Sequence, residues 1–175
     1  MARKKSPGSS EQRLADGRAA PIRDFSRSLP MTLLRTREAV MRQFRPSLRQ
    51  HGLTEQQWRI LRALASVEAV EVTELARMAF LLGPSLSRIL RDLETRGLIE
   101  RRAAENDLRR ARVSISQEGL KLIEIVAPYS EAIYAEITRR YGTSRLKDLQ
   151  QMLGALEGSL ARLEGATSED GESEE

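Results

Sequence analysis

The 175-residue sequence predicts a mainly α fold with a small β-hairpin. Apolar residues recur at three- and four-residue steps in several long segments, which is the spacing of amphipathic helices. Aromatic residues make up only 4% of the chain, so the core must be built from aliphatic side chains. Two short apolar segments, 98–99 and 113–115, flank a polar connection and supply the two strands of the hairpin. The length is that of about one domain.

Two helices are expected within residues 30–65. The first covers residues 30–48, and Pro46 is expected to kink its last turn. After a break at residues 51–52, Thr54 and Gln57 have the spacing of a capping box, which marks a new helix start. The residues expected on the buried faces of these two helices are Leu33, Leu34, Met41, Phe44, Leu48, Trp58, Leu61, Leu64 and Ala65.

A short helix and a longer one follow in close succession. Residues 72–79 form the short helix, with Leu75 and Ala79 on one side. An apolar turn, residues 80–82, separates it from a helix that begins near Gly83. A short helix, a tight turn and a longer helix predict a helix-turn-helix, in which the first helix supports the second.

The longer helix has its own start and stop signals. Pro suits the first helical turn because it gives up only an N–H that has no helical partner there, and Pro84 has that place. Gly97 after a basic last turn is typical of a left-handed cap. Its apolar face is formed by Leu86, Ile89, Leu90 and Leu93. Its exposed, polar face is formed by Pro84, Arg88, Arg91 and Thr95.

The connection between the two strands, residues 103–110, is rich in charge. Asp107 and Arg109 lie two residues apart, so an extended chain points both side chains the same way. The carboxylate would then brace the guanidinium and leave its other N–H groups directed outward. A hairpin with an arginine-rich tip after a helix-turn-helix is the layout of a winged helix-turn-helix.

This layout predicts a DNA-binding surface, since the major groove admits an α-helix and arginine bonds guanine edges and phosphates. Arginine-rich helices are also common as solvated faces, and that alternative stays open for the helix alone. The residues expected on the major groove and its phosphates are Ser85, Ser87, Arg88, Arg91 and Thr95. In the wing, Asp107 braces Arg109, which is expected in the minor groove, with Arg110 and Arg112 on phosphates.

The sequence from Glu74 to Arg102, ELARMAFLLGPSLSRILRDLETRGLIERR, followed by NDLRRARVSISQEG, resembles the MarR family of bacterial transcription regulators. The family's wing pattern, Asp-x-Arg, a Val-x-Leu-Thr strand and Gly, is matched here by Asp107, Arg109, Val113, Ile115, Ser116 and Gly119. The resemblance covers about residues 28–163. The segment HGLTEQQWRILRAL, residues 51–64, is similar to the subgroup named for regulators of homoprotocatechuate degradation.

Two long helices, residues 116–140 and 144–163, are expected to complete the chain. The last has leucines on one face at 149, 153, 156, 160 and 163, which need another helix against them. Packing within the chain would cover this face, but a homodimer also suits a palindromic operator, and the resemblance implies one. The expected layout is a disordered basic arm at 1–27, a helical dimerisation region at 28–50 and 117–163, a winged helix-turn-helix at 51–116 and a disordered acidic tail at 164–175.

The net charge of +4 is unevenly distributed. Residues 1–27 hold seven bases and three acids, and residues 164–175 hold six acids and no base, so the body between them carries +6. A basic body favours attraction to DNA phosphates, and the first segment would act as a DNA-binding arm or as a solubilising tail. Neither a membrane span nor a signal peptide is evident, which predicts a cytoplasmic protein without a membrane partner.

No catalytic or metal-binding pattern is found, so the sequence predicts neither an enzyme nor a cofactor. There is no cysteine, and His51 is the only histidine. The resemblance instead implies a site for a small aromatic acid, which requires an apolar wall and cationic donors. The candidates are Ser28, Met31, Arg35, His51 and Trp58, although Trp58 would serve equally as a core residue and His51 as a helix cap.

Together these features predict a dimeric, ligand-responsive transcription regulator that represses an aromatic-catabolism operon. The effector would resemble hydroxyphenylacetate, homoprotocatechuate or a hydroxynicotinate, and its binding would release the operator. A ligand-independent architectural or nucleoid-type DNA-binding protein is the alternative. A protein-binding winged helix is a third, because it shares this core but lacks a basic tip.

Overall fold

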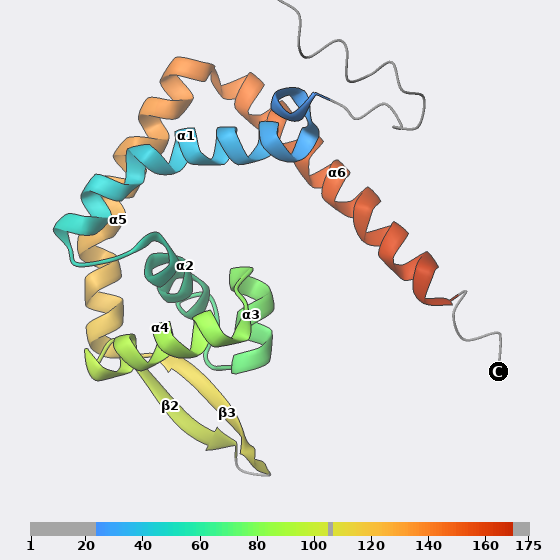
Figure 1. Ribbon diagram of the computed structural model, residues 1–175. Coiled ribbons are helices and arrows are strands. Elements are labelled where there is room, and N and C mark those ends of the chain that lie inside the picture. Colours follow the sequence, from blue (N-terminus) through green and yellow to red (C-terminus); the bar gives the residue numbers. More distant parts are fainter. Residues whose placement is uncertain (1–23, 105–106, 170–175) are drawn as a thin grey trace, which may run out of the picture. The chain divides into compact units, whose positions relative to one another are not determined.

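The computed structural model describes residues 24–104 and 107–169, and it divides into two units, 1–42 and 43–175. The described part is mainly helical, with one small antiparallel sheet, as the sequence predicts (Figure 1). The boundary between the units lies inside the helix α1, Leu29–Gln50, so each unit is described by itself. In the first unit, a short 3-10 helix, Phe25–Arg27, precedes α1 and is capped by Asp24.

The part of α1 in the second unit ends beside the core. Phe44 and Leu48 are buried there, and Pro46 lies within a helix that continues to Gln50. Helix α2, Glu55–Leu64, then starts at the predicted capping box. The Gln57 amide N–H donates to the Thr54 hydroxyl (3.2 Å), and the Thr54 amide N–H donates to the Gln57 side chain (2.7 Å).

The predicted helix-turn-helix is formed by α3, Val72–Ala79, and α4, Gly83–Thr95. Their apolar faces meet α2 in an aliphatic core whose fully buried members include Ile60, Leu61, Leu64, Leu75, Ala79, Leu86, Leu90 and Leu93. Helix α3 ends at Phe80, whose backbone is left-handed with a φ of 48°. In each of these two helices, the fully buried residues lie on one face. The apolar spacing in the sequence was therefore enough to predict which residues are buried.

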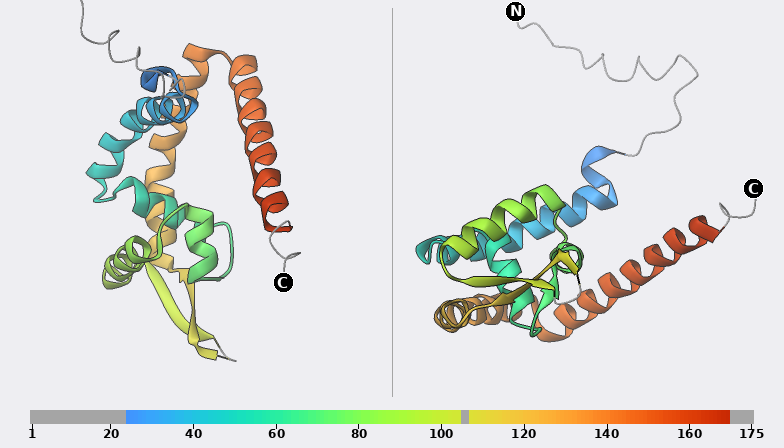
Figure 2. Two further views of the ribbon diagram at one scale, coloured as in Figure 1. Left: turned by 45° about the vertical axis from the view of Figure 1, so that its right-hand side comes forward. Right: turned by 90° about the horizontal axis from the view of Figure 1, so that it is seen from below.

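The sheet has three strands in the order β1-β3-β2. Strands β2, Ile99–Ala104, and β3, Asp107–Ile115, form the expected hairpin (Figure 2). They pair antiparallel from Ile99 opposite Ile115, with a register shift after Ala103. The third strand, β1, Val70–Glu71, pairs with β3 and was not predicted. It anchors the segment before α3 to the base of the wing.

Two long helices complete the second unit. Helix α5, Gln117–Tyr141, contains Pro128 without interruption, and α6, Thr143–Glu169, continues six residues past the expected end at Leu163. Residues 164–169 contain no proline, so every residue of this segment keeps the backbone N–H that a continuing helix requires, although Gly165 is a poor helix former.

The winged helix-turn-helix lobe, residues 51–116, hereafter the reading lobe because of the DNA-binding role predicted above, joins α5 at a tight junction. The Ser116 hydroxyl donates to the Gly97 carbonyl (2.6 Å) and accepts from the Gly119 amide (3.0 Å), while the Ser116 amide donates to the Leu98 carbonyl (3.1 Å). A Cβ on Gly119 would overlap the Leu98 carbonyl oxygen and would lie 2.7 Å from Cγ1 of Ile115. The end of α4, the end of β3 and the start of α5 are therefore packed together without space for a methyl group.

Candidate DNA interface and effector site

Helix α4 presents a polar face away from the core. Ser85, Ser87, Arg88 and Arg91 are exposed, and nothing in the described hydrogen bonds or ion pairs engages their side chains. Thr95 is also exposed, but its hydroxyl donates to the Arg91 carbonyl (2.8 Å) within the helix. The two arginines are thus available to bond guanine edges or phosphates, whereas the Thr95 hydroxyl has a partner in its own helix.

Side chains of α2 form hydrogen bonds with both helices that flank the turn before α4. The Arg59 guanidinium donates to the Ala79 carbonyl (2.8 Å), the last residue of α3, and lies 3.5 Å from Glu55. Gln57 on the same helix donates to the Asp92 carboxylate of α4 (2.7 Å). Two polar links from α2 therefore fix both helices of the helix-turn-helix, in addition to the apolar core.

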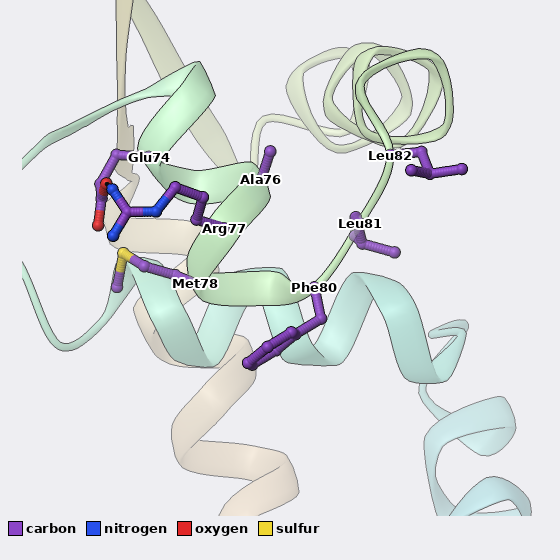
Figure 3. Close-up of a pocket in the computed structure, with 7 residues that line it drawn as sticks. All are labelled: Glu74, Ala76, Arg77, Met78, Phe80, Leu81 and Leu82. Atoms are coloured by element: carbon purple, nitrogen blue, oxygen red, sulfur yellow. Dashed lines mark hydrogen bonds and ion pairs between the residues drawn. The ribbon is translucent and has the colours of Figure 1, made fainter. Parts of the chain in front are cut away.

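The outer side of the turn carries an open, largely apolar hollow of about 690 Å³ (Figure 3). Its far end holds an ion pair between Glu74 and Arg77 at 2.6 Å. The apolar part is lined by Ala76, Met78, Phe80, Leu81 and Leu82. This hollow was not anticipated from the sequence.

In the wing, the structure gives Arg112 a partner that the sequence did not suggest. Its exposed side chain donates to the Ala69 carbonyl just before β1 (3.0 Å), so one N–H supports the third strand while others remain for a phosphate. Asp107, Arg109 and Arg110 belong to β3, but their side chains lie outside the described residues. The proposed Asp107 brace is therefore a prediction still.

The predicted effector residues Trp58 and His51 lie in the second unit. Trp58 is half-buried, and the Arg62 guanidinium lies 5.8 Å from the centre of its ring. A ring nitrogen of His51 lies 2.9 Å from the Ser47 carbonyl, and its ring packs at 5.2 Å from Tyr129. Trp58 therefore combines an apolar surface with an adjacent cation, whereas His51 also has the expected role at the end of α1.

The other predicted effector residues belong to the first unit. Ser28 caps the short 3-10 helix, with its hydroxyl donating to the Phe25 carbonyl (2.9 Å). Met31 is half-buried and Arg35 is exposed on α1. Each keeps a side chain that is at least partly accessible within its own unit.

The effector candidates taken from the sequence did not include Arg62 of α2 or Tyr129 and Tyr134 of α5. Arg62 stands four residues after Trp58, which places both on one helix face, so the spacing was a usable signal. Tyr134 packs against Phe44 with ring centres 5.0 Å apart and is still 52% exposed, and Tyr129 is 50% exposed. Their contacts join α5 to the end of α1, and no local pattern reveals such a pairing.

Helix α6 keeps its apolar side chains accessible. No residue of 143–162 is buried, and Met152, Leu153 and Leu160 are 62%, 41% and 49% exposed. Within the described residues, no helix is long and apolar enough to cross a membrane. The same residues contain no group of three or more His, Cys, Asp or Glu side chains placed to hold a metal ion.

Residues 51–110 match the model of the MarR family. The chain is also 38% identical over 143 residues to the HTH-type transcriptional regulator FarR of Neisseria gonorrhoeae, covering 80% of this chain and 98% of that protein. The chain belongs to the MarR family. Like its relatives, this MarR-family protein is a DNA-binding transcription regulator with a winged helix, and it is not an enzyme.

Three further proteins are similar to this MarR-family chain. The homoprotocatechuate degradative operon repressor of Escherichia coli is 38% identical over 126 residues, which is 72% of this chain and 85% of the repressor. The crystal structure of NadR in complex with 4-hydroxyphenylacetate is 37% identical, with a TM-score of 0.67, covering 78% of this chain and 97% of NadR. The repressor CouR bound to a 23-mer DNA duplex, 23% identical with a TM-score of 0.70, shares the fold.

Proposed function

We propose that this regulator is a cytoplasmic homodimer that represses an aromatic-catabolism operon from a palindromic operator and is released by a small aromatic acid. The observation that carries the proposal is the exposed face of α4, where two arginines and two serines without described partners project from a rigid helix. The similarity to the homoprotocatechuate operon repressor supports the regulated process.

The dimer is supported by the accessible side of α6. A single chain leaves Met152, Leu153 and Leu160 largely in water, although these side chains gain free energy when they are buried. A second copy would cover them with the same surface, as a two-fold symmetric interface requires. Two reading helices would then meet half-sites about one helical turn apart.

The effector site is proposed around Trp58. An aromatic acid presents a flat apolar ring and a carboxylate, and the indole face beside the Arg62 guanidinium matches both groups. His51, in the same unit as Trp58, would contribute to this site, while Ser28, Met31 and Arg35 of the other unit stay candidates from the sequence. The complex of NadR with 4-hydroxyphenylacetate supports a hydroxyphenylacetate-like or homoprotocatechuate-like molecule, and a hydroxynicotinate has the same acid and ring chemistry.

Release of DNA follows as a population shift. The effector would stabilise dimers whose reading helices are wrongly spaced for the operator, and operator affinity would fall by no more than the ratio of effector affinities for the two forms. Gln57 and Arg59 connect α2, which carries Trp58, to both helices of the reader. This connection provides a short physical route from the effector to DNA.

The DNA-binding proposal is tested by comparing duplexes from the region upstream of the chain's own gene with random duplexes of equal length, at several salt concentrations. A repressor should prefer one upstream site by about a thousandfold or more. Equal affinity for all duplexes, with a steep salt dependence, would instead support the architectural alternative. Arg109→Ala should weaken binding, and unchanged binding would contradict the wing assignment.

The effector proposal is tested by thermal unfolding with a panel of hydroxyphenyl and hydroxypyridine acids. A compound at one hundred times its Kd should stabilise the native form by about 2.7 kcal/mol. Arg62→Gln should reduce this stabilisation, whereas Arg49→Gln on exposed α1 should not. The absence of a shift with every acid at millimolar concentration would contradict the sensor proposal.

A further inference from the structure

An ion pair joins α4, the second helix of the helix-turn-helix, to the first strand of the wing. The Nε atom of Arg101 in β2 lies 3.3 Å from a carboxylate oxygen of Glu94, near the end of α4. Among the described side chains, no other ion pair or hydrogen bond connects α4 to the hairpin 99–115. Figure 1 shows the two strands extending away from α4 to the tip of the wing, so this pair links the helix to the base of the projecting hairpin.

The alternation of the strand directs Arg101 to the side of the hairpin that faces α4. Arg101 is opposite Val113, whose side chain is completely buried, and Arg101 itself is only 29% exposed. Glu100 and Arg102, one position before and after it, point to the other side of the sheet. They form an ion pair with each other at 2.8 Å, and the Arg102 side chain is 81% exposed. Neighbouring arginines of one strand therefore have different partners, and one of these partners belongs to α4.

The stability of the fold does not explain the pair between Arg101 and Glu94. Two nitrogens of the Arg101 guanidinium, Nε and Nη2, are shielded from water and have no hydrogen-bond acceptor, which costs free energy. The Glu94 side chain is 43% exposed, and ion pairs with an exposed partner contribute little to stability. A carboxylate on this helix is also repelled by DNA phosphates. What the pair supplies is a fixed geometry between α4 and β2.

We propose that Arg101 is a positioning residue whose contact with Glu94 sets the tilt of the wing relative to α4, so that Arg109 reaches the minor groove while α4 lies in the major groove. The hairpin continues from Arg101 to Ala104, about 10 Å, and its register shifts after Ala103. A change of tilt at Arg101 is therefore carried to the tip. This inference rests on the proposed DNA contact of Arg109 and adds the contact that directs it.

The test is a double-mutant cycle on the full chain, with a duplex that the wild type selects from a randomised pool. Arg109→Ala should weaken binding by the wild type about tenfold, the effect of losing one arginine contact. In the Arg101→Met background the wing is no longer held, so Arg109→Ala should weaken binding less than about twofold. Glu94→Ala removes the other partner and should have the same consequence. Arg88→Ala, which removes an arginine of α4, should keep its full effect in all these backgrounds.

Arg102→Met is the matched control, because it breaks the ion pair on the opposite side of the same strand and should leave the effect of Arg109→Ala unchanged. Arg101→Met should melt close to the wild-type temperature, since Glu94 stays hydrated and the shielded donors are removed.

A full effect of Arg109→Ala in both the Arg101→Met and the Glu94→Ala backgrounds would overturn the proposal, because an independent DNA contact of Arg101 gives that result. A lost effect in the Arg102→Met background would overturn it as well. If Arg109→Ala leaves binding by the wild type unchanged, the proposed wing contact itself is wrong, and this inference falls with it.

Discussion

Gly119→Ala probes the junction between the reading lobe and α5. The added Cβ would overlap the Leu98 carbonyl oxygen and lie 2.7 Å from Cγ1 of Ile115, so part of the main chain must shift. Overpacking of this kind costs about 1 to 3 kcal/mol, and the better helix propensity of alanine offsets up to about 1 kcal/mol. The two ranges leave a net loss of about 1.5 kcal/mol at their midpoints and at most about 3 kcal/mol, and the midpoint corresponds to a fall in Tm of about 3 to 6 °C.

The assay is thermal unfolding followed by far-UV circular dichroism at a fixed protein concentration. Gly154→Ala in α6 is the control, because a Cβ there meets no atom within 4 Å and the variant should be as stable as the wild type or slightly more stable. DNA affinity of Gly119→Ala should also fall, since the junction orients α4 and the wing. Equal melting temperatures for the two variants would refute the reasoning about the junction.

Two further predictions concern polar links. Arg59→Met removes the hydrogen bond to the Ala79 carbonyl but keeps the apolar stem of the side chain. It should lower the free energy of unfolding by about 1 kcal/mol and weaken operator binding. An unchanged denaturant midpoint and an unchanged operator affinity would show that this bond does not position the turn. Arg139 and Arg140 lower the pKa of Glu136 to about 2. Because the folded-state pKa is below the ordinary value of 4.5, the stabilisation is present above pH 4.5 and is lost as the pH falls toward 2. Glu136→Gln should remove this part of the pH dependence of Tm, and identical pH profiles for wild type and variant would contradict it.

The sequence was most informative where structure is local. The stripe of α4 and the capping box at Thr54 depend on residues a few positions apart, and the structure contains both of them. Strand β1 is only two residues long and exists through pairing with β3, some forty residues away. No periodicity can be detected in two residues, so this strand could not be predicted.

In the candidate sites as well, features set by local spacing could be predicted from the sequence, and long-range contacts could not. The exposed face of α4 follows from helical spacing, and the structure describes those side chains as exposed. The partner of Arg112 is the Ala69 carbonyl, a long-range contact created by β1, which the sequence did not reveal. The cation beside Trp58 lies within reach of pattern reasoning, since Arg62 is one helical turn away. The contacts of Tyr134 with Phe44 and of Tyr129 with His51 could be found only from the folded structure.

The junction at Ser116 also has a mechanical meaning. Helix α4 has 13 residues and is therefore about 20 Å long. Because Gly97 and Leu98, which directly follow α4, are packed against the start of α5 without free space, the lobe that holds α4 would follow a tilt of α5 about this junction. A rotation of about 5° at this junction would displace the N-terminal end of α4 by about 1.7 Å, more than half the length of a hydrogen bond. A small tilt of α5 would thus be enough to take base contacts out of reach while the lobe itself stays folded.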